Sequence, residues 1–112
     1  RSAEAAAAGQ SDGEARRQVR EDTRVGYRNL TTAMDRLPPL RDHVASSGRT
    51  LVDYQGQFEL GRRKLLDLLD AQVENYQARS ALVDGEYTLL VAQFRLAFAM
   101  GQIRGALGIP GD

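Results

Sequence analysis

Mostly apolar residues recur every seven positions along residues 66–103, in two pairs of columns. At about 100° per residue, the two pairs lie on opposite sides of one α-helix. A helix with a seam on each side needs a neighbour on each side, as in the wall of a cylinder made of helices. We name the first pair the aromatic seam: Leu66, Val73, Ser80, Tyr87, Phe94 and Gly101 beside Leu69, Tyr76, Val83, Leu90 and Ala97. The second pair is the alanine seam, whose small residues let one neighbour approach closely: Leu68, Asn75, Leu82, Leu89, Leu96 and Ile103 beside Ala71, Ala78, Gly85, Ala92 and Ala99.

An earlier part of the chain carries one seam of the same kind. Its alternating spacing of three and four residues is typical of a coiled coil. Pro38 and Pro39 interrupt it without changing its phase, so we expect a kinked helix, with a break as the alternative. The seam consists of Leu30, Leu37, Val44, Leu51 and Phe58, with Ala33, Leu40, Ser47 and Tyr54 between them.

The two patterns are joined by Gly61, Arg62, Arg63 and Lys64. Glycine readily takes the left-handed conformation that ends a helix. The three cations follow where carbonyl groups at the end of the first helix would be left unpaired. We therefore predict that residues 61–64 form the tip turn of a hairpin.

The predicted fold class is all-α: a long antiparallel helical hairpin, coiled-coil-like, that forms a piece of an α-helical barrel. Residues 1–13 are expected to be a frayed or mobile segment, because glycines interrupt its alanines. The first helix covers 14–60 and the returning helix 65–104, with a flexible tail at 105–112. Two helices cannot enclose a core, so we expect a fragment like this to self-associate.

Composition excludes several functions. The formal net charge is zero, which argues against a nucleic-acid binder, and without cysteine there is no thiolate metal site. No run of about 18 apolar residues spans a membrane. No serine, histidine and acid trio suggests a nucleophilic site, and no glycine-rich loop follows a strand pattern. We therefore expect neither an enzyme nor a cofactor. His43 stands alone, so a solvent-facing histidine is favoured over a metal ligand, and we expect no intrinsic metal site.

The other positions of the returning helix form two polar strips. If a wall of helices closes into a tube, one strip faces the bore and the other faces outward. Periodicity does not say which, but the mostly acidic strip is the better candidate for a lumen. The acidic strip holds Asp67, Asp70, Glu74, Gln77, Asp84 and Thr88; the second strip holds Gln72, Arg79, Glu86 and Gln93.

The stretches Tyr54–Arg79, Ala81–Tyr87, Phe94–Leu96 and Ala99–Gly101 resemble the last periplasmic hairpin of TolC-like outer-membrane efflux proteins. The likeness covers roughly Tyr27–Ile103 and is densest around the tip. It implies a homotrimer whose helices form a tunnel across the periplasm of a Gram-negative cell. Such a duct passes solutes for efflux or type I secretion, driven by an inner-membrane pump through a periplasmic adaptor.

The resemblance also implies roles for residues at the tip. Asp67 and Asp70 correspond to two rings of aspartates that constrict the tunnel entrance, where a bound cation would block passage. Arg63 corresponds to an arginine that holds the closed state through interchain contacts, and the turn from Gly61 to Lys64 would meet the adaptor. At Lys64 the family usually has Thr or Ser, which would cap the returning helix, and lysine cannot.

Simpler interpretations remain for each of these features. Asp67 and Asp70 can act as first-turn acids that offset the helix dipole. The cations Arg62, Arg63 and Lys64 can form a solvated turn. The whole hairpin can instead be a coiled-coil interaction module, such as the hairpin of the adaptor itself.

Overall fold

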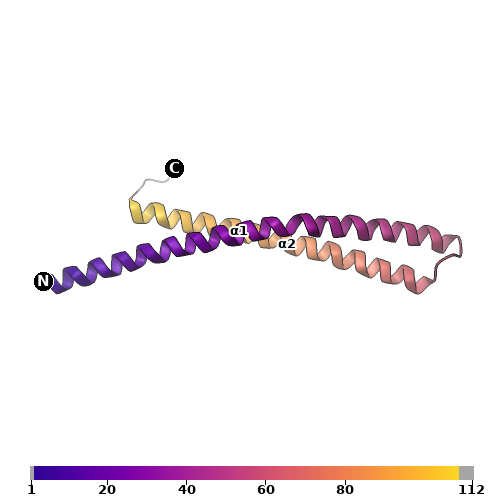
Figure 1. The fold of residues 1–112 in the computed structure, drawn as a ribbon, viewed down its shortest axis with the longest axis horizontal. Coiled ribbons are helices and arrows are strands. Elements are labelled where there is room, and N and C mark those ends of the chain that lie inside the picture. The colour runs from indigo at the N-terminus through magenta and orange to yellow at the C-terminus, as the bar shows by residue number, and fades with distance from the viewer. Residues whose placement is uncertain (1, 109–112) are drawn as a thin grey trace. The chain divides into compact units, whose positions relative to one another are not determined.

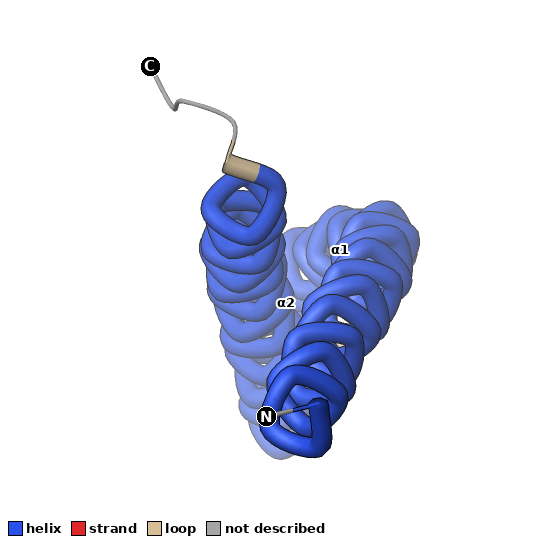
Figure 2. Tube along the Cα trace, turned by 90° about the vertical axis from the view of Figure 1, so that its left-hand side faces the viewer, coloured by secondary structure: helices blue, strands red, loops and turns tan. Residues whose placement is uncertain are grey.

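The computed structural model describes residues 2–108, with side chains described for residues 9–105 and 108. Two α-helices account for nearly all of them: α1 (Ser2–Glu59) and α2 (Leu65–Leu107), shown in Figure 1. The described residues contain no strand, and the trace is helical along both elements (Figure 2). The predicted all-α class and the helical hairpin are confirmed.

The residues group into two compact units. One unit is Ala33–Leu89, in which the C-terminal part of α1 leads into the turn and the N-terminal part of α2 returns antiparallel to it. The other unit combines Arg1–Thr32 with Leu90–Asp112. Each unit therefore pairs one segment of α1 with one segment of α2.

At its N-terminal end, α1 begins earlier than the sequence pattern indicated. Residues 2–13, where we expected a frayed or mobile segment, are assigned to the helix. The segment is rich in alanine, which has the highest helix propensity and offsets a cost of about 1 kcal/mol for each of its two glycines. That this end of the helix frays in solution stays a prediction.

At the other end, α2 continues past the predicted boundary at residue 104 and stops at Leu107. Gly108 follows with a φ of 69°, the left-handed conformation that commonly terminates helices. The predicted tail therefore begins later than expected. Its last residues, 109–112, lie outside the described part of the chain.

Helix α1 is continuous through Pro38 and Pro39. Each proline lacks the amide hydrogen for one intrahelical bond. The seam residues beside them, Leu37 and Leu40, contribute packing against α2, and Leu37 is only 5% exposed. A break at the prolines is therefore wrong, and the size of any bend stays a prediction.

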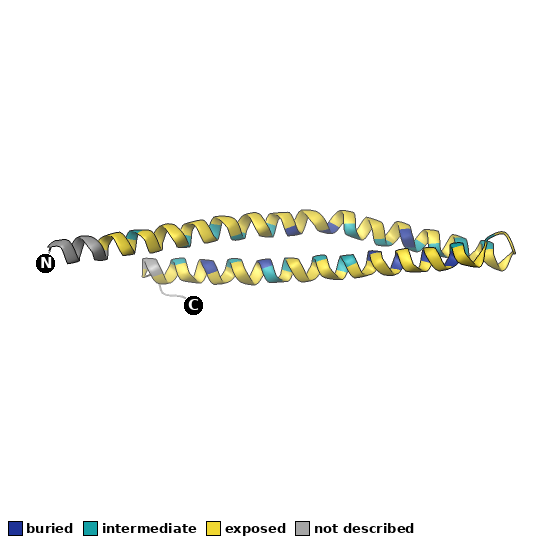
Figure 3. Cartoon of the chain, turned by 90° about the horizontal axis from the view of Figure 1, so that it is seen from below, coloured by how far each residue is buried: buried dark blue, intermediate teal, exposed yellow. Residues whose placement is uncertain are grey.

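In the unit Ala33–Leu89, the heptad seam of α1 packs on the alanine seam of α2. Figure 3 shows the buried positions on the facing sides of the two helices. Phe58, which we placed at the end of the α1 seam, is an exception, because α1 ends one residue later and Phe58 stays exposed. The buried residues of this unit are Ala33, Leu37, Ser47, Leu68, Ala71, Asn75 and Ala78.

Gly85 marks the closest approach in this seam. A Cβ atom at Gly85 would lie 2.6 Å from Leu40 Cδ1 and 3.4 Å from Leu37 Cδ2. Leucine at this position needs volume that both α1 side chains already fill. We expect Gly85→Leu to lower the free energy of unfolding by about 1–3 kcal/mol, measured by urea unfolding.

Gly56→Leu is the matched control, because nothing lies within 4 Å of a Cβ atom at Gly56. There the substitution should show mainly the gain in helix propensity, up to about 1 kcal/mol. Equal effects at Gly85 and Gly56 would contradict the close approach of the two helices.

A buried polar contact interrupts the same seam. Asn75 Nδ2 donates to Ser47 Oγ at 3.1 Å, and Ser47 Oγ donates to the Val44 carbonyl oxygen at 3.2 Å. Polar pairs of this kind specify register in coiled coils at some cost in stability. The pair therefore favours one alignment of α1 against α2.

Ser47→Ala is expected to cost about 1–3 kcal/mol of unfolding free energy, because it leaves the buried Asn75 amide without its partner. The double variant Ser47→Ala with Asn75→Leu should recover most of that loss, since both polar groups are then gone. Chemical denaturation of the two variants tests this. A double variant less stable than Ser47→Ala would contradict it.

In the unit that contains Leu90–Asp112, the alanine seam again faces α1. Ala92 and Ala99 are buried, and a Cβ atom at Gly26 of α1 would lie 3.5 Å from Leu96 Cδ1. The contact that α1 makes with α2 thus uses the same columns of α2 in both units.

The aromatic seam of α2 has no partner among the described residues. Its large side chains are exposed in each unit, with Tyr76 65% and Phe94 68% accessible. Large apolar patches on soluble surfaces generally mark interaction sites. The two-sided pattern is therefore real in this chain: α1 covers one seam and leaves the other uncovered. The exposed members are Leu66, Leu69, Val73, Tyr76, Val83, Tyr87, Leu90 and Phe94.

Candidate functional site

The tip turn ends α1 in a Schellman motif. The amide of Arg62 donates to the Gln57 carbonyl oxygen at 2.8 Å, and the amide of Gly61 donates to the Phe58 carbonyl oxygen at 2.9 Å. Gly61 has a φ of 72°, which costs glycine nothing. The prediction that Gly61 stops the first helix in the left-handed conformation is confirmed.

Lys64 lies immediately before α2. Its carbonyl oxygen accepts the first helical bond, from the Leu68 amide at 3.3 Å. Among the described residues, no hydrogen bond joins the Lys64 side chain to the first amides of α2. The returning helix therefore starts without the side-chain cap that Thr or Ser would supply.

Arg63 folds back onto its own α1. Its Nε and Nη2 atoms donate to Gln57 Oε1 at 2.9 and 2.7 Å. Its guanidinium carbon lies 3.9 Å from the centre of the Tyr54 ring. Its Nη1 atom lies 3.7 Å from Asp67 Oδ2. Within a single chain Arg63 is thus held by three side chains, and an interchain contact stays a prediction.

The sequence did not indicate a functional role for two of those three side chains. Tyr54 was assigned to packing in the seam, and Gln57 was given no role. The available signal was their spacing: Tyr54, Gln57 and Gly61 are separated by three and four residues, which places them on one face of α1 near its end. The turn brings Arg63 onto that face.

The rest of the tip is open to solvent. Arg62 and Lys64 are exposed and form no ion pair with the described residues. Leu60 and Leu65 flank them with 70% and 54% of their surfaces accessible. The tip therefore presents two cations beside two apolar side chains.

Asp67 and Asp70 lie in the first two turns of α2, as predicted. Asp67 is half-buried beside Arg63, whereas Asp70 is exposed and has no ion pair with any described residue. Residues three apart are neighbours on a helix surface, so the two carboxylates share one side of α2. A single chain shows them together at the tip; their part in a gate stays a prediction.

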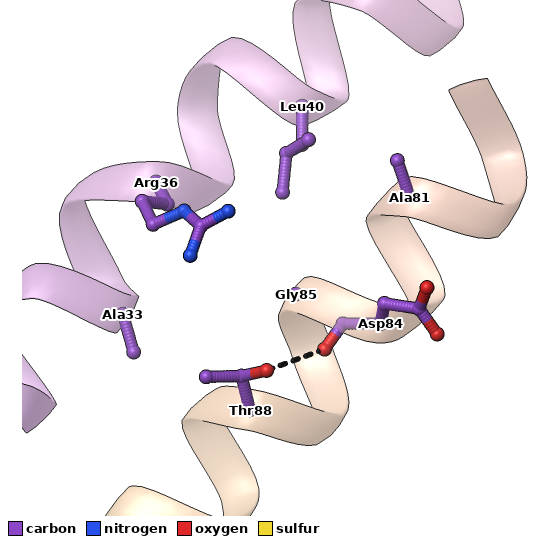
Figure 4. Close-up of a pocket in the computed structure, with 7 residues that line it drawn as sticks. All are labelled: Ala33, Arg36, Leu40, Ala81, Asp84, Gly85 and Thr88. Atoms are coloured by element: carbon purple, nitrogen blue, oxygen red, sulfur yellow. Dashed lines mark hydrogen bonds between the residues drawn. The ribbon is translucent and has the colours of Figure 1, made fainter. Parts of the chain in front are cut away.

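A cavity of about 180 Å³ lies further along the unit Ala33–Leu89 (Figure 4). The Arg36 guanidinium reaches toward α2, while the Asp84 carboxylate points away from it and Thr88 Oγ1 donates to the Asp84 carbonyl oxygen at 2.9 Å. Ligand pockets usually enclose roughly 300–1,000 Å³, so this one is small. Its lining is Ala33, Arg36, Leu40, Ala81, Asp84, Gly85 and Thr88.

The other charged contacts are solvated. His43 Nε2 lies 3.5 Å from Glu74 Oε1, with both side chains about half exposed or more. In the other unit, the hydrogen bond from Arg24 holds the pKa of Glu21 below its usual value, and both side chains are more than half exposed. Exposed pairs of this kind contribute little to stability. The described residues include no group of three or more potential metal ligands.

Neither α1 nor α2, over the described residues, has a stretch both long and apolar enough to cross a membrane.

Comparisons with known proteins agree on one family. A model of the outer membrane efflux protein family matches residues 1–102. Outer membrane protein TolC of Salmonella enteritidis is 26% identical over 89 residues, and TolC of Escherichia coli K12 is 25% identical over 89 residues. Each alignment covers 80% of this chain but only 18% of the relative. No solved structure is significantly similar to the chain.

Proposed function

The chain belongs to the outer membrane efflux protein family, and on that premise we propose that it forms part of the wall of a periplasmic tunnel. The tunnel is a passive duct for efflux or secretion, built by three copies of a longer protein. An inner-membrane pump supplies the energy through a periplasmic adaptor. The hairpin is the part of the duct that carries the entrance.

The uncovered aromatic seam is the observation that carries this proposal. A lone hairpin gains nothing from apolar residues such as Tyr76 and Val83 on the side away from α1, where both are more than 60% exposed. A barrel of helices gives each helix a second neighbour, and that neighbour removes the seam from water. At about 25 cal/mol per Å² of apolar surface, covering it favours assembly.

The same arrangement leaves one polar strip on each side of the wall. With the alanine seam on α1 and the aromatic seam on a neighbouring helix, the strip with Asp67 and Asp70 faces either the bore or the outside. We place it in the bore, because threefold symmetry then gathers the carboxylates at the entrance. Carboxylates held close together attract a divalent cation, which offsets their mutual repulsion. The gate formed by Asp67 and Asp70 is thus the cation-sensitive part of the duct.

The tip turn meets the adaptor. Arg62 and Lys64 are exposed and Leu60 and Leu65 stand beside them, which supports a partner with acidic and apolar side chains. Arg63 is the weaker candidate for that contact, because Gln57, Tyr54 and Asp67 already hold it.

The test is to purify the full-length protein, determine its oligomeric state and record its conductance in a planar bilayer. A trimer that conducts ions supports the duct. A protein that folds but neither trimerises nor conducts overturns it, and the adaptor hairpin becomes the better interpretation. Lipoyl-like, β-rich segments flanking the hairpin in the parent reading frame would point the same way.

A further inference from the structure

Arg63 contacts one member of the aspartate pair. Its Nη1 atom lies 3.7 Å from Asp67 Oδ2, and Asp70 forms no ion pair with any described residue. Among the described residues, the Arg63 guanidinium is therefore the one cation within ion-pair distance of either aspartate proposed for the entrance. Arg62 and Lys64 carry the same charge in the same turn, but neither lies within ion-pair distance of a described carboxylate.

The position of Arg63 is set by two side chains of α1. Gln57 Oε1 accepts hydrogen bonds from Nε and Nη2, and the Tyr54 ring stacks under the guanidinium. These contacts use one edge and one face of the group and leave Nη1 directed to Asp67. A planar guanidinium makes this combination of contacts and a lysine ammonium does not.

We propose that Arg63 is a built-in counter-ion of the entrance, held against Asp67 by Tyr54 and Gln57 as positioning residues. The proposal rests on the proposed duct and deepens it. Arg63 repels a cation at the entrance and competes with it for Asp67, so Asp70 is the carboxylate most open to direct contact. The turn thus lowers the cation affinity of the entrance without removing either aspartate.

The experiment is a Mg²⁺ titration of single-channel conductance in the full-length protein, from the side of the hairpin tip. Arg63→Gln is expected to lower the half-blocking concentration of Mg²⁺ about two- to fivefold, the size of effect typical of a partly exposed ion pair. Gln57→Leu and Tyr54→Leu should shift it in the same direction, although neither changes a charge. The Schellman turn survives Gln57→Leu because it uses the backbone oxygen of Gln57.

Arg62→Gln is the matched control, since it removes the same charge from the same turn without touching Asp67. Arg63→Lys keeps the charge but loses the fork to Gln57, so it should behave more like Arg63→Gln than like the unmodified channel. The effect of Arg63→Gln should also be larger in the Asp70→Asn background than in the Asp67→Asn background, since Arg63 competes only for Asp67.

If Arg62→Gln and Arg63→Gln shifted the half-blocking concentration of Mg²⁺ equally, Arg63 would not be the counter-ion of the entrance. The same would follow if Gln57→Leu left that concentration unchanged. Neither result would contradict the proposed duct. If the full-length protein did not conduct at all, both the proposed duct and the proposed role of Arg63 would be contradicted.

Discussion

A single carboxylate in the aromatic seam is expected to abolish the trimer of the full-length channel. Val83→Asp is the sharpest variant, because Val83 is 62% exposed in the single chain and would become covered by a neighbouring helix. Burying an unpaired carboxylate costs several kcal/mol, and symmetry repeats the cost in every copy. Native mass spectrometry and bilayer recordings should show monomers and no conductance.

The helical hairpin itself should survive Val83→Asp, since Val83 is 62% exposed in the single chain, and circular dichroism of the isolated chain checks that. Gln72→Asp is the matched control: it makes the same change in charge at an exposed position of a polar strip. If Val83→Asp assembles and conducts as Gln72→Asp does, the aromatic seam is not an interface and the barrel loses its main support.

The sequence predicted both seams of α2 but not which one α1 would cover. Both are apolar over the same length, so hydrophobic periodicity treats them alike. The choice is made by close approach: Ala71, Ala78 and Gly85 let the backbones come together, whereas Tyr76 and Tyr87 would hold them apart. That small residues admit a close neighbour was predicted; that the neighbour is α1 needed the three-dimensional structure.

At the tip, the backbone conformation of the turn was predictable from the sequence, and the side-chain contacts of Arg63 were not. The left-handed Gly61 follows from the properties of glycine alone. The cluster around Arg63 depends on where the turn directs a long side chain after the chain reverses, and no spacing rule gives that direction. The helix ends were missed because Gly9, Gly13 and Gly105 weaken a helix without ending it.

The aspartates of the tip provide the second large effect. Asp67→Asn combined with Asp70→Asn in the full-length channel is expected to raise the half-blocking concentration of Mg²⁺ by a factor of about 5–30. This corresponds to the loss of roughly 1–2 kcal/mol of cation binding. The physical reason is that threefold symmetry sets several carboxylates around one narrow opening, where each adds attraction for the same cation. Conductance without added Mg²⁺ should rise as well, because ions bound from the buffer no longer obstruct the opening.

Asp84→Asn separates a gate from a general loss of negative charge. Asp84 lies on the same polar strip as Asp67 and Asp70 but several turns further along α2. A gate requires the block to depend on the pair at the tip and to change little with Asp84→Asn, measured by the same titration. If the channel conducts and neither variant changes the block, Asp67 and Asp70 are first-turn acids that offset the helix dipole, a role worth under about 1 kcal/mol each. The duct would then need its constriction elsewhere, and the aromatic seam would remain the feature of this chain that demands a partner.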